Sequence, residues 1–195
     1  QIGLSNTGTI TGGDGFRANS TVTNISIVNS GTILGDDSSG QGNGYGVYTQ
    51  SNGFQLNNSG TIGGNNGAFL GGTFVEVVYN SGTMLGDVSL NDGDDVYIAF
   101  GNGLSTGAVR GGDGDDDLRG AAAADQLKGD NDGDTLRGRG GEDTLDGGNG
   151  SDLLLGGNDD DALRETIADC PGLVAKHRTL AVDFNRGYIA ELGAK

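Results

Sequence analysis

Short apolar stretches, rich in β-branched residues, alternate with Gly- and Asn-rich segments along the first half of the chain. Each stretch leads into a phrase of the type Asn-Ser-Gly-Thr-Ile. The phrases begin at Asn6, Asn29, Asn58 and Asn80. Short strands between Gly corners, repeating at intervals of roughly 20–30 residues, are typical of a solenoid. We therefore predict a right-handed parallel β-helix over residues 1–89, with the Gly/Ser-rich run 36–46 as a loop inserted in the longest coil.

Coils of a parallel β-helix stack about 4.8 Å apart, so equivalent residues form ladders. The apolar residue that ends each phrase is expected to belong to an interior stack. These residues are Ile10, Ile33, Ile62 and Met84. The four Asn residues are expected to form a second ladder at a corner, in which each amide bonds to the next coil.

One coil conflicts with this alignment. Counting back from Asn80 puts Glu76 at the inward position that Ile25 and Phe54 occupy in earlier coils. A carboxylate should not point into an apolar interior. We therefore expect a bulge or a shifted register in the coil that contains Glu76.

From Gly111 a repeat of nine begins, and it holds for six units, through Arg164. The sixth position is always Asp, at Asp116, Asp125, Asp134, Asp143, Asp152 and Asp161. The eighth position is always Leu, at Leu118, Leu127, Leu136, Leu145, Leu154 and Leu163. The end of each unit predicts a brief strand whose middle Leu points inward. The preceding Gly-rich residues predict a turn, because glycine allows positive φ.

These units resemble the repeat GGxGxDxUx of the RTX, or hemolysin-type calcium-binding, family. The resemblance covers residues 111–164, and a partial unit, Leu90 to Tyr97, precedes it. It implies a parallel β-roll that holds Ca²⁺ between stacked Gly-Asp turns, where carbonyls of positions two and four join the position-six carboxylate. The metal ligands predicted in this way are Gly112, Gly114, Asp116, Asp125, Asp132, Asp134, Gly141, Asp143, Gly148, Gly150, Asp152 and Asp161.

The excess of acidic residues in the repeats also indicates Ca²⁺ as the cofactor. Two units make one turn of the roll, so successive acids alternate between its two edges. Carboxylates stacked about 5 Å apart repel by roughly 1 kcal/mol even at the dielectric constant of water, and residues 111–164 hold 15 acids against five bases. Ca²⁺ takes about six to eight oxygen ligands, carboxylates and carbonyls alike. We therefore expect the roll to be folded with Ca²⁺ and unfolded without it.

The repeat is not kept everywhere. Alanines replace the glycines at positions 121–124 of the second unit, and Asp132 stands where the third unit should have its second Gly. Alanine disfavours the positive φ that the turn requires. We therefore expect the site between Asp125 and Asp143 to be weak or empty.

Composition narrows the classes of function. The 195 residues include 41 Gly, are 33% hydrophobic and carry a net charge of −16, which argues against nucleic acid and anionic membranes as partners. No stretch resembles a signal peptide or a membrane span. The repeats contain no His or Cys for zinc or iron, and no candidate loop has the twelfth-position Glu of an EF-hand. Residues 1–89 hold five acids, one base and no His, so we expect no enzyme.

We expect four segments: a β-helix over 1–89, a transition coil over 90–110, the β-roll over 111–164 and a short C-terminal cap over 165–195. Residues 179–192 have the pattern of a β-hairpin. A solenoid needs a cap over its last coil, where Leu153 and Leu155 would otherwise be exposed. A type I secretion signal is the alternative interpretation of this tail.

The first half is expected to be a scaffold only, and the second half is expected to fold when it binds metal. Together they indicate a secreted, non-enzymatic, calcium-binding structural or adhesive module of a bacterial surface or extracellular matrix. The alternative is an accessory module of an extracellular enzyme, a polysaccharide epimerase, lyase or protease, whose catalytic part is not in this chain. The expected partners are calcium ions and copies of the chain stacked end to end, and a surface or glycan ligand is left open. The chain begins at Gln1, and we expect it to be part of a longer protein.

Overall fold

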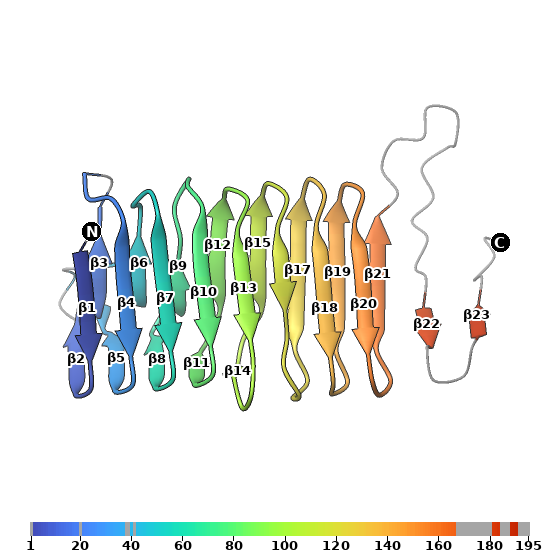
Figure 1. The fold of residues 1–195 in the computed structure, drawn as a ribbon, viewed down its shortest axis with the longest axis horizontal. Coiled ribbons are helices and arrows are strands. Elements are labelled where there is room, and N and C mark those ends of the chain that lie inside the picture. The colour runs from blue at the N-terminus through green and yellow to red at the C-terminus, as the bar shows by residue number, and fades with distance from the viewer. Residues whose placement is uncertain are drawn as a thin grey trace.

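The computed structural model is a parallel β-solenoid whose coils stack along one long axis (Figure 1). It describes residues 2–19, 21–37, 40, 42–166, 181–183 and 188–190. Two eight-stranded sheets and one five-stranded sheet form its walls, and all three are parallel. No helix among these residues is long and apolar enough to cross a membrane. The predicted all-β, parallel solenoid class is confirmed.

Each of the first five coils contributes one strand to each sheet, whereas the last three coils have only two strands each. Sheet A contains β1 (Ile2–Asn6), β4 (Ile25–Asn29), β7 (Phe54–Asn58), β10 (Glu76–Asn80), β13 (Val96–Ala99), β16 (Asp117–Arg119), β18 (Thr135–Arg139) and β20 (Leu153–Gly157). Sheet B contains β2 (Thr9–Gly12), β5 (Thr32–Gly35), β8 (Thr61–Gly64), β11 (Thr83–Leu85) and β14 (Leu104–Ser105). Sheet C contains β3 (Phe16–Ala18), β6 (Tyr45–Thr49), β9 (Gly67–Leu70), β12 (Val88–Asp92), β15 (Val109–Asp113), β17 (Gln126–Asn131), β19 (Thr144–Asn149) and β21 (Ala162–Thr166).

The coil shortens where sheet B ends. Equivalent positions of sheet A are separated by 23, 29 and 22 in the first coils, from β1 to β10. The separation then falls to 19 and 21, and it is 18 for both steps from β16 to β20. A coil this short has room for two short strands and two turns only, so the third sheet stops at β14.

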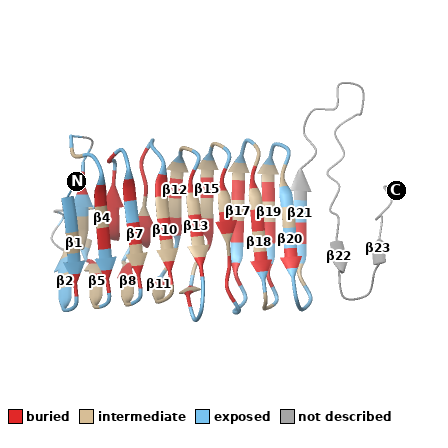
Figure 2. Ribbon diagram, in the orientation of Figure 1, coloured by how far each residue is buried: buried red, intermediate tan, exposed pale blue. Residues whose placement is uncertain are grey.

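The interior consists of apolar ladders that each coil extends by one residue. Ile33, Ile62 and Met84 pair in register and are fully buried, while Ile10 at the first coil is partly buried. In the roll the inward Leu residues pair in the same way along both sheets. Figure 2 shows buried positions alternating with more exposed ones along many of the strands, among them β4, β7 and β17. The predicted interior stacks are confirmed.

The predicted Asn ladder forms at the corner between sheets A and B. The Nδ2 of Asn6, Asn29 and Asn58 donates to Oδ1 of the Asn in the next coil, at 2.8, 2.8 and 2.9 Å. The ladder ends at Asn80, whose Nδ2 donates to the hydroxyl of Tyr97 at 3.3 Å. An amide carries both a donor and an acceptor, so each member can pair with a copy of itself above and below.

The predicted register shift at Glu76 is wrong. β10 pairs with β7 without interruption, Glu76 lies opposite Phe54, and its side chain is fully buried. The Glu76 backbone N–H donates to Oδ1 of Asp95 at 2.6 Å, and the Gly72 N–H donates to Oε2 of Glu76 at 3.4 Å. Polar groups of its own turn and of the next coil therefore hold Glu76 in the inward position.

The tail contains a short antiparallel pair, β22 (Ala181–Asp183) with β23 (Tyr188–Ala190), as the predicted hairpin requires. The predicted cap and its alternative, a secretion signal, concern residues 165–195, most of which lie outside the described residues. Leu153 and Leu155 on β20 are 48% and 38% exposed.

The Asn ladder gives a first testable prediction. Asn58→Ala leaves the buried amides of Asn29 and Asn80 without their partner, so we expect it to lower the free energy of unfolding by about 2–4 kcal/mol. The matched control is Asn57→Ala at the neighbouring, half-exposed position on the same strand. Urea denaturation measures both, and equal effects of the two variants would contradict a structural role for the ladder.

Candidate metal centre

Buried acids follow one another along the upper edge of the solenoid in Figure 1, at the turns that lead from sheet C into sheet A. Each acid after the first accepts, through Oδ1, the backbone N–H of the equivalent acid in the preceding coil. Glu76 donates to Asp95 at 2.6 Å, and Asp95 donates to Asp116 at 2.8 Å. Asp116 donates to Asp134, and Asp134 to Asp152, both at 2.9 Å. We call these five residues the upper ladder.

A lower ladder lies at the turns that lead from sheet A into sheet C. The Asp125 N–H donates to Oδ1 of Asp143 at 2.8 Å, and the Asp143 N–H donates to Oδ1 of Asp161 at 3.0 Å. Asp125 and Asp143 are 3% and 1% exposed. The alternation of acids between two edges, expected from the nine-residue period, is therefore what the structure has.

Left-handed backbone recurs at positions two and four of the turns. On the upper edge Gly112, Gly114, Gly148 and Gly150 have φ values of 128°, 125°, 99° and 146°. Other residue types adopt this conformation at the equivalent positions: Asn91, Asp130, Asp132, Arg139 and Asp159, with φ between 72° and 81°. Asp and Asn tolerate positive φ better than most residues, so Asp132 replaces a glycine without changing the turn.

Carbonyl oxygens of these positions face the next coil. A β-carbon on Gly112 would lie 1.7 Å from the carbonyl oxygen of Asn91, and one on Gly150 would lie 1.8 Å from that of Asp132. At Gly112 and Gly150 a side chain would collide with that carbonyl, whereas Asp130 and Asp132 occupy the equivalent positions of the coil between them at smaller φ. Glycine at these positions therefore keeps a row of carbonyl oxygens between adjacent turns.

The position-one glycines form a second close approach, which we call the glycine cradle. A β-carbon on Gly111 would lie 1.9 Å from Oδ2 of Asp116 and 2.9 Å from the carbonyl oxygen of Gly129 in the next coil. At Gly129 and Gly138 the carboxylate oxygen would be 2.0 and 2.1 Å away, and the carbonyl oxygen of the next coil 2.5 and 2.6 Å away. A carboxylate oxygen and a carbonyl oxygen thus converge in the space that a side chain would fill.

The second carboxylate oxygen is the unsatisfied group of these turns. Oδ2 of Asp116, Asp134 and Asp143 is buried and accepts no hydrogen bond from any group in the described part of the chain. The alanine-containing unit differs, because Ala121 is not left-handed and its N–H donates to Oδ2 of Asp125 at 2.9 Å. The expectation of a weak site between Asp125 and Asp143 thus gains a geometric basis, and metal binding itself stays a prediction.

Burial makes these acids hard to ionise. Desolvation, opposed by the Asp95 N–H and reinforced by neighbouring carboxylates, raises the pKa of Asp116 to about 8. Desolvation is also the main reason that the pKa of Asp95, Asp134 and Asp143 rises to about 7. The pKa of Glu76 rises to about 9, because it is desolvated and lies beside Asp95. These carboxyls need either a proton or a cation to remain inside the folded solenoid.

The donor atoms around the turns are all oxygens. Within the described residues, no three His, Cys, Asp or Glu side chains come together as a metal-binding group. A cation between two turns would therefore take one or two carboxylates and complete its shell with backbone carbonyls. That set of ligands suits a hard cation such as Ca²⁺, and it lacks the imidazole and thiolate that softer metals prefer.

Every residue predicted as a metal ligand lies at one of these two rows of turns. The upper row holds Gly112, Gly114, Asp116, Asp132, Asp134, Gly148, Gly150 and Asp152, and the lower row holds Asp125, Gly141, Asp143 and Asp161. The sequence prediction missed Asp95, which is 1% exposed and belongs to the upper ladder. A signal for it was present, since Asn91 and Gly93 occupy positions two and four of its partial unit and are left-handed.

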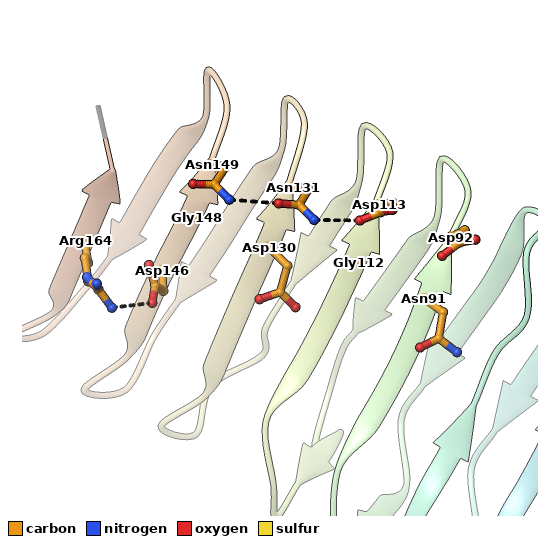
Figure 3. A pocket seen from close by; sticks show the side chains of 10 residues that line it. All are labelled: Asn91, Asp92, Gly112, Asp113, Asp130, Asn131, Asp146, Gly148, Asn149 and Arg164. Carbon is orange, nitrogen blue, oxygen red and sulfur yellow. Dashed lines mark hydrogen bonds and ion pairs between the residues drawn. The ribbon is translucent and has the colours of Figure 1, made fainter. Parts of the chain in front are cut away.

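A polar groove of about 510 Å³ lies beside the upper turns, across the ends of β12, β15, β17 and β19 (Figure 3). The Nδ2 of Asn149 donates to Oδ1 of Asn131 at 2.9 Å, and the Nδ2 of Asn131 donates to Oδ1 of Asp113 at 2.6 Å. Arg164 and Asp146 form an ion pair of 3.0 Å at its border. The groove is thus a surface feature whose side chains bond across coils, separate from the buried ladders.

The raised pKa values predict how pH acts on the metal-free protein. Each ladder acid with a raised pKa binds its proton more tightly in the folded than in the unfolded chain, so folding favours its protonated form. The stability that results is fully present below about pH 4 and is lost as the pH rises towards 8. In calcium-depleted buffer, protonation should partly replace the cation, and we therefore expect more folded β-structure at pH 5 than at pH 8 in far-UV circular dichroism. Equal or less β-structure at pH 5 would show that the acids are not buried as described.

Protein-family models, curated proteins and solved structures were each compared with this chain, and none matches it. The parallel solenoid of about eight turns is compatible with a β-roll repeat protein. The likeness of residues 111–164 to RTX repeats rests on the repeated residues themselves. The fold and the two acid ladders are therefore the basis for a functional assignment.

Proposed function

We propose that residues 111–164 form an RTX-type β-roll that binds Ca²⁺ between successive turns and folds when it does so. The observation that carries this proposal is the set of buried Oδ2 atoms of Asp116, Asp134 and Asp143, which have no hydrogen-bond donor among the described residues. Each faces a carbonyl oxygen of the next coil across a glycine cradle. A calcium ion would supply the positive charge that these groups lack.

Among the described residues, the basic side chains that form the ion pairs below do not take this role. Arg119 and Arg137 form ion pairs with Asp117, and Arg164 pairs with Asp146, so these bases neutralise acids on the outer surface. None of these pairs involves an acid of either ladder. Water cannot screen buried carboxylates, so each of these acids keeps a proton or binds a cation, and a cation would displace the proton as the pH rises.

Asp95, Asp116, Asp134 and Asp152 would hold ions on the upper edge, together with carbonyls at positions two and four. Asp143 and Asp161 would do so on the lower edge. Bound Ca²⁺ would hold adjacent turns together by charge, and the metal-binding energy would become folding energy. The chain's own residues orient the carboxylates, through the backbone N–H groups that bind each Oδ1.

The biological role that we propose is a secreted, non-enzymatic structural or adhesive module of a bacterial surface or extracellular matrix. Calcium is scarce in the cytoplasm and abundant outside cells, so the roll would stay unfolded for export and fold afterwards. The polar groove beside the upper turns offers a long surface for contact with an external ligand. We also propose that copies of the chain stack end to end, because edge strands such as β1 and β2 can pair with a further parallel strand.

The calcium proposal is tested by charge removal in the middle of the upper ladder. Asp134→Asn keeps an oxygen acceptor for the Asp116 N–H but removes one charge, and we expect the calcium midpoint for folding to rise by about tenfold or more. The control is Asp160→Asn, which makes the same change at an exposed position. Far-UV circular dichroism during calcium titration gives the midpoints. A wild-type spectrum that is identical in EDTA and in calcium, or equal midpoints for both variants, would contradict the proposal.

The alanine-containing unit allows a gain-of-function test. The double variant Ala121→Gly, Ala123→Gly permits left-handed backbone at positions two and four and should withdraw the Ala121 N–H from Asp125. We expect it to bind one more calcium ion than the wild type, counted by isothermal titration calorimetry. Ala124→Gly, at position five, serves as the control for added backbone flexibility. An unchanged number of ions would show that the alanines do not limit this site.

A further inference from the structure

The turn before β10 lies outside the nine-residue repeats and nevertheless carries the first acid of the upper ladder. Glu76 is 0% exposed and lies in register between Phe54 on one side and the Asp95 turn on the other. An apolar residue occupies this inward position in the two preceding coils, at Ile25 and Phe54. Packing alone would therefore favour an apolar residue in place of Glu76.

The Glu76 turn has two oxygen arrangements found in the repeat turns. A β-carbon on Gly71 would lie 2.8 Å from Oε2 of Glu76 and 2.1 Å from the carbonyl oxygen of Leu90 in the next coil, as in the glycine cradle. Here the cradle oxygen also accepts the Gly72 N–H, over a long 3.4 Å, and the unsatisfied oxygen is Oε1. A β-carbon on Gly93 would lie 2.7 Å from the carbonyl oxygen of Phe74, as one on Gly114 would lie 2.3 Å from that of Gly93. Gly71 and Phe74 thus act as positions one and four of a turn that the sequence does not mark as a repeat.

The same turn holds unsatisfied charge. Oε1 of Glu76 and Oδ2 of Asp95 are buried and accept no hydrogen bond from any described residue. Neither side chain belongs to an ion pair of the described chain. Two carboxylates in adjacent coils are therefore buried together with carbonyl oxygens and without a compensating base.

We propose that Glu76 and Asp95 form a binding site for a hard divalent cation of the Ca²⁺ type, completed by backbone carbonyls of the turns that carry them. This inference deepens the proposed function and rests on it at Asp95, and it goes beyond that function at Glu76, which lies in a coil outside the nine-residue repeats. The site would fasten the last coils of the β-helix to the first coil of the roll. Calcium would then control the order of residues 71–99, not of the repeats alone.

The test is Glu76→Gln, which preserves the size of the side chain and an oxygen acceptor but removes the charge. We expect the variant to bind one calcium ion fewer per chain than the wild type in equilibrium dialysis. Hydrogen–deuterium exchange should show that calcium protects residues 71–99 of the wild type and protects them less in the variant. The control is Glu142→Gln, the same change outside the two ladders, which should leave both measurements unaltered.

Stability measurements on the metal-free protein distinguish a cation site at Glu76 from a purely structural role of this side chain. Removing a buried charge should leave Glu76→Gln at least as stable as the wild type in EDTA, and less stable than the wild type in calcium. A variant that binds as many ions as the wild type overturns the inference. So does a wild-type chain whose residues 71–99 gain no protection from calcium, and this second measurement needs no variant. Calcium protection of 71–99 without protection of 111–164 would instead contradict the proposed function alone.

Discussion

The corner of each coil imposes the constraint on which this solenoid depends, because a residue that points inward there meets its own equivalent in the next coil. An apolar residue satisfies the constraint by packing, as Ile33 and Ile62 do. An Asn satisfies it by pairing amide with amide, as in the ladder from Asn6 to Asn80. A carboxylate cannot pair with another carboxylate. In the acid ladders, one oxygen therefore accepts the backbone N–H of the preceding coil, as in Asp134. The other oxygen of Asp116, Asp134 and Asp143 has no donor among the described residues and needs a proton or a cation.

The two halves of the molecule differ mainly in how they meet this constraint. Self-complementary Asn corners in the first coils need neither a proton nor an ion, since an amide does not titrate and pairs with its own equivalent. Acid corners should make the later coils responsive to pH and, as we propose, to divalent cations, since Asp116, Asp134 and Asp143 each have a raised pKa and an unsatisfied oxygen. The change from one type of corner to the other begins on the upper edge at Glu76, before sheet B ends at β14.

Much of this fold follows from periodicity. The recurrence of Asn-Ser-Gly-Thr-Ile predicts the Asn ladder and the Ile stack, and the nine-residue repeat predicts both acid rows and the inward Leu residues. The place of Glu76 and Asp95 in the upper ladder was not predicted. Glu76 is separated from Asp95 by 19 residues, and Asp95 from Asp116 by 21. These separations match neither the longer period of the first coils nor the regular period of the roll. An inward Glu also contradicts the hydrophobic pattern, and only the next coil's Asp95 shows why the register is kept.

The glycines of the roll have a second role beyond turn conformation. Gly111 and Gly129 are not among the left-handed residues, so backbone φ alone would allow alanine at these positions. A β-carbon there would nevertheless overlap the Oδ2 of Asp116 or Asp134 and approach the carbonyl oxygen of the next coil. Position-one glycine therefore preserves a space between oxygens, and such a space is where a cation, not a side chain, can hold two coils together. Gly71 leaves a similar space outside the repeats, and this geometry supports the site that we propose at Glu76, which the repeat pattern does not mark.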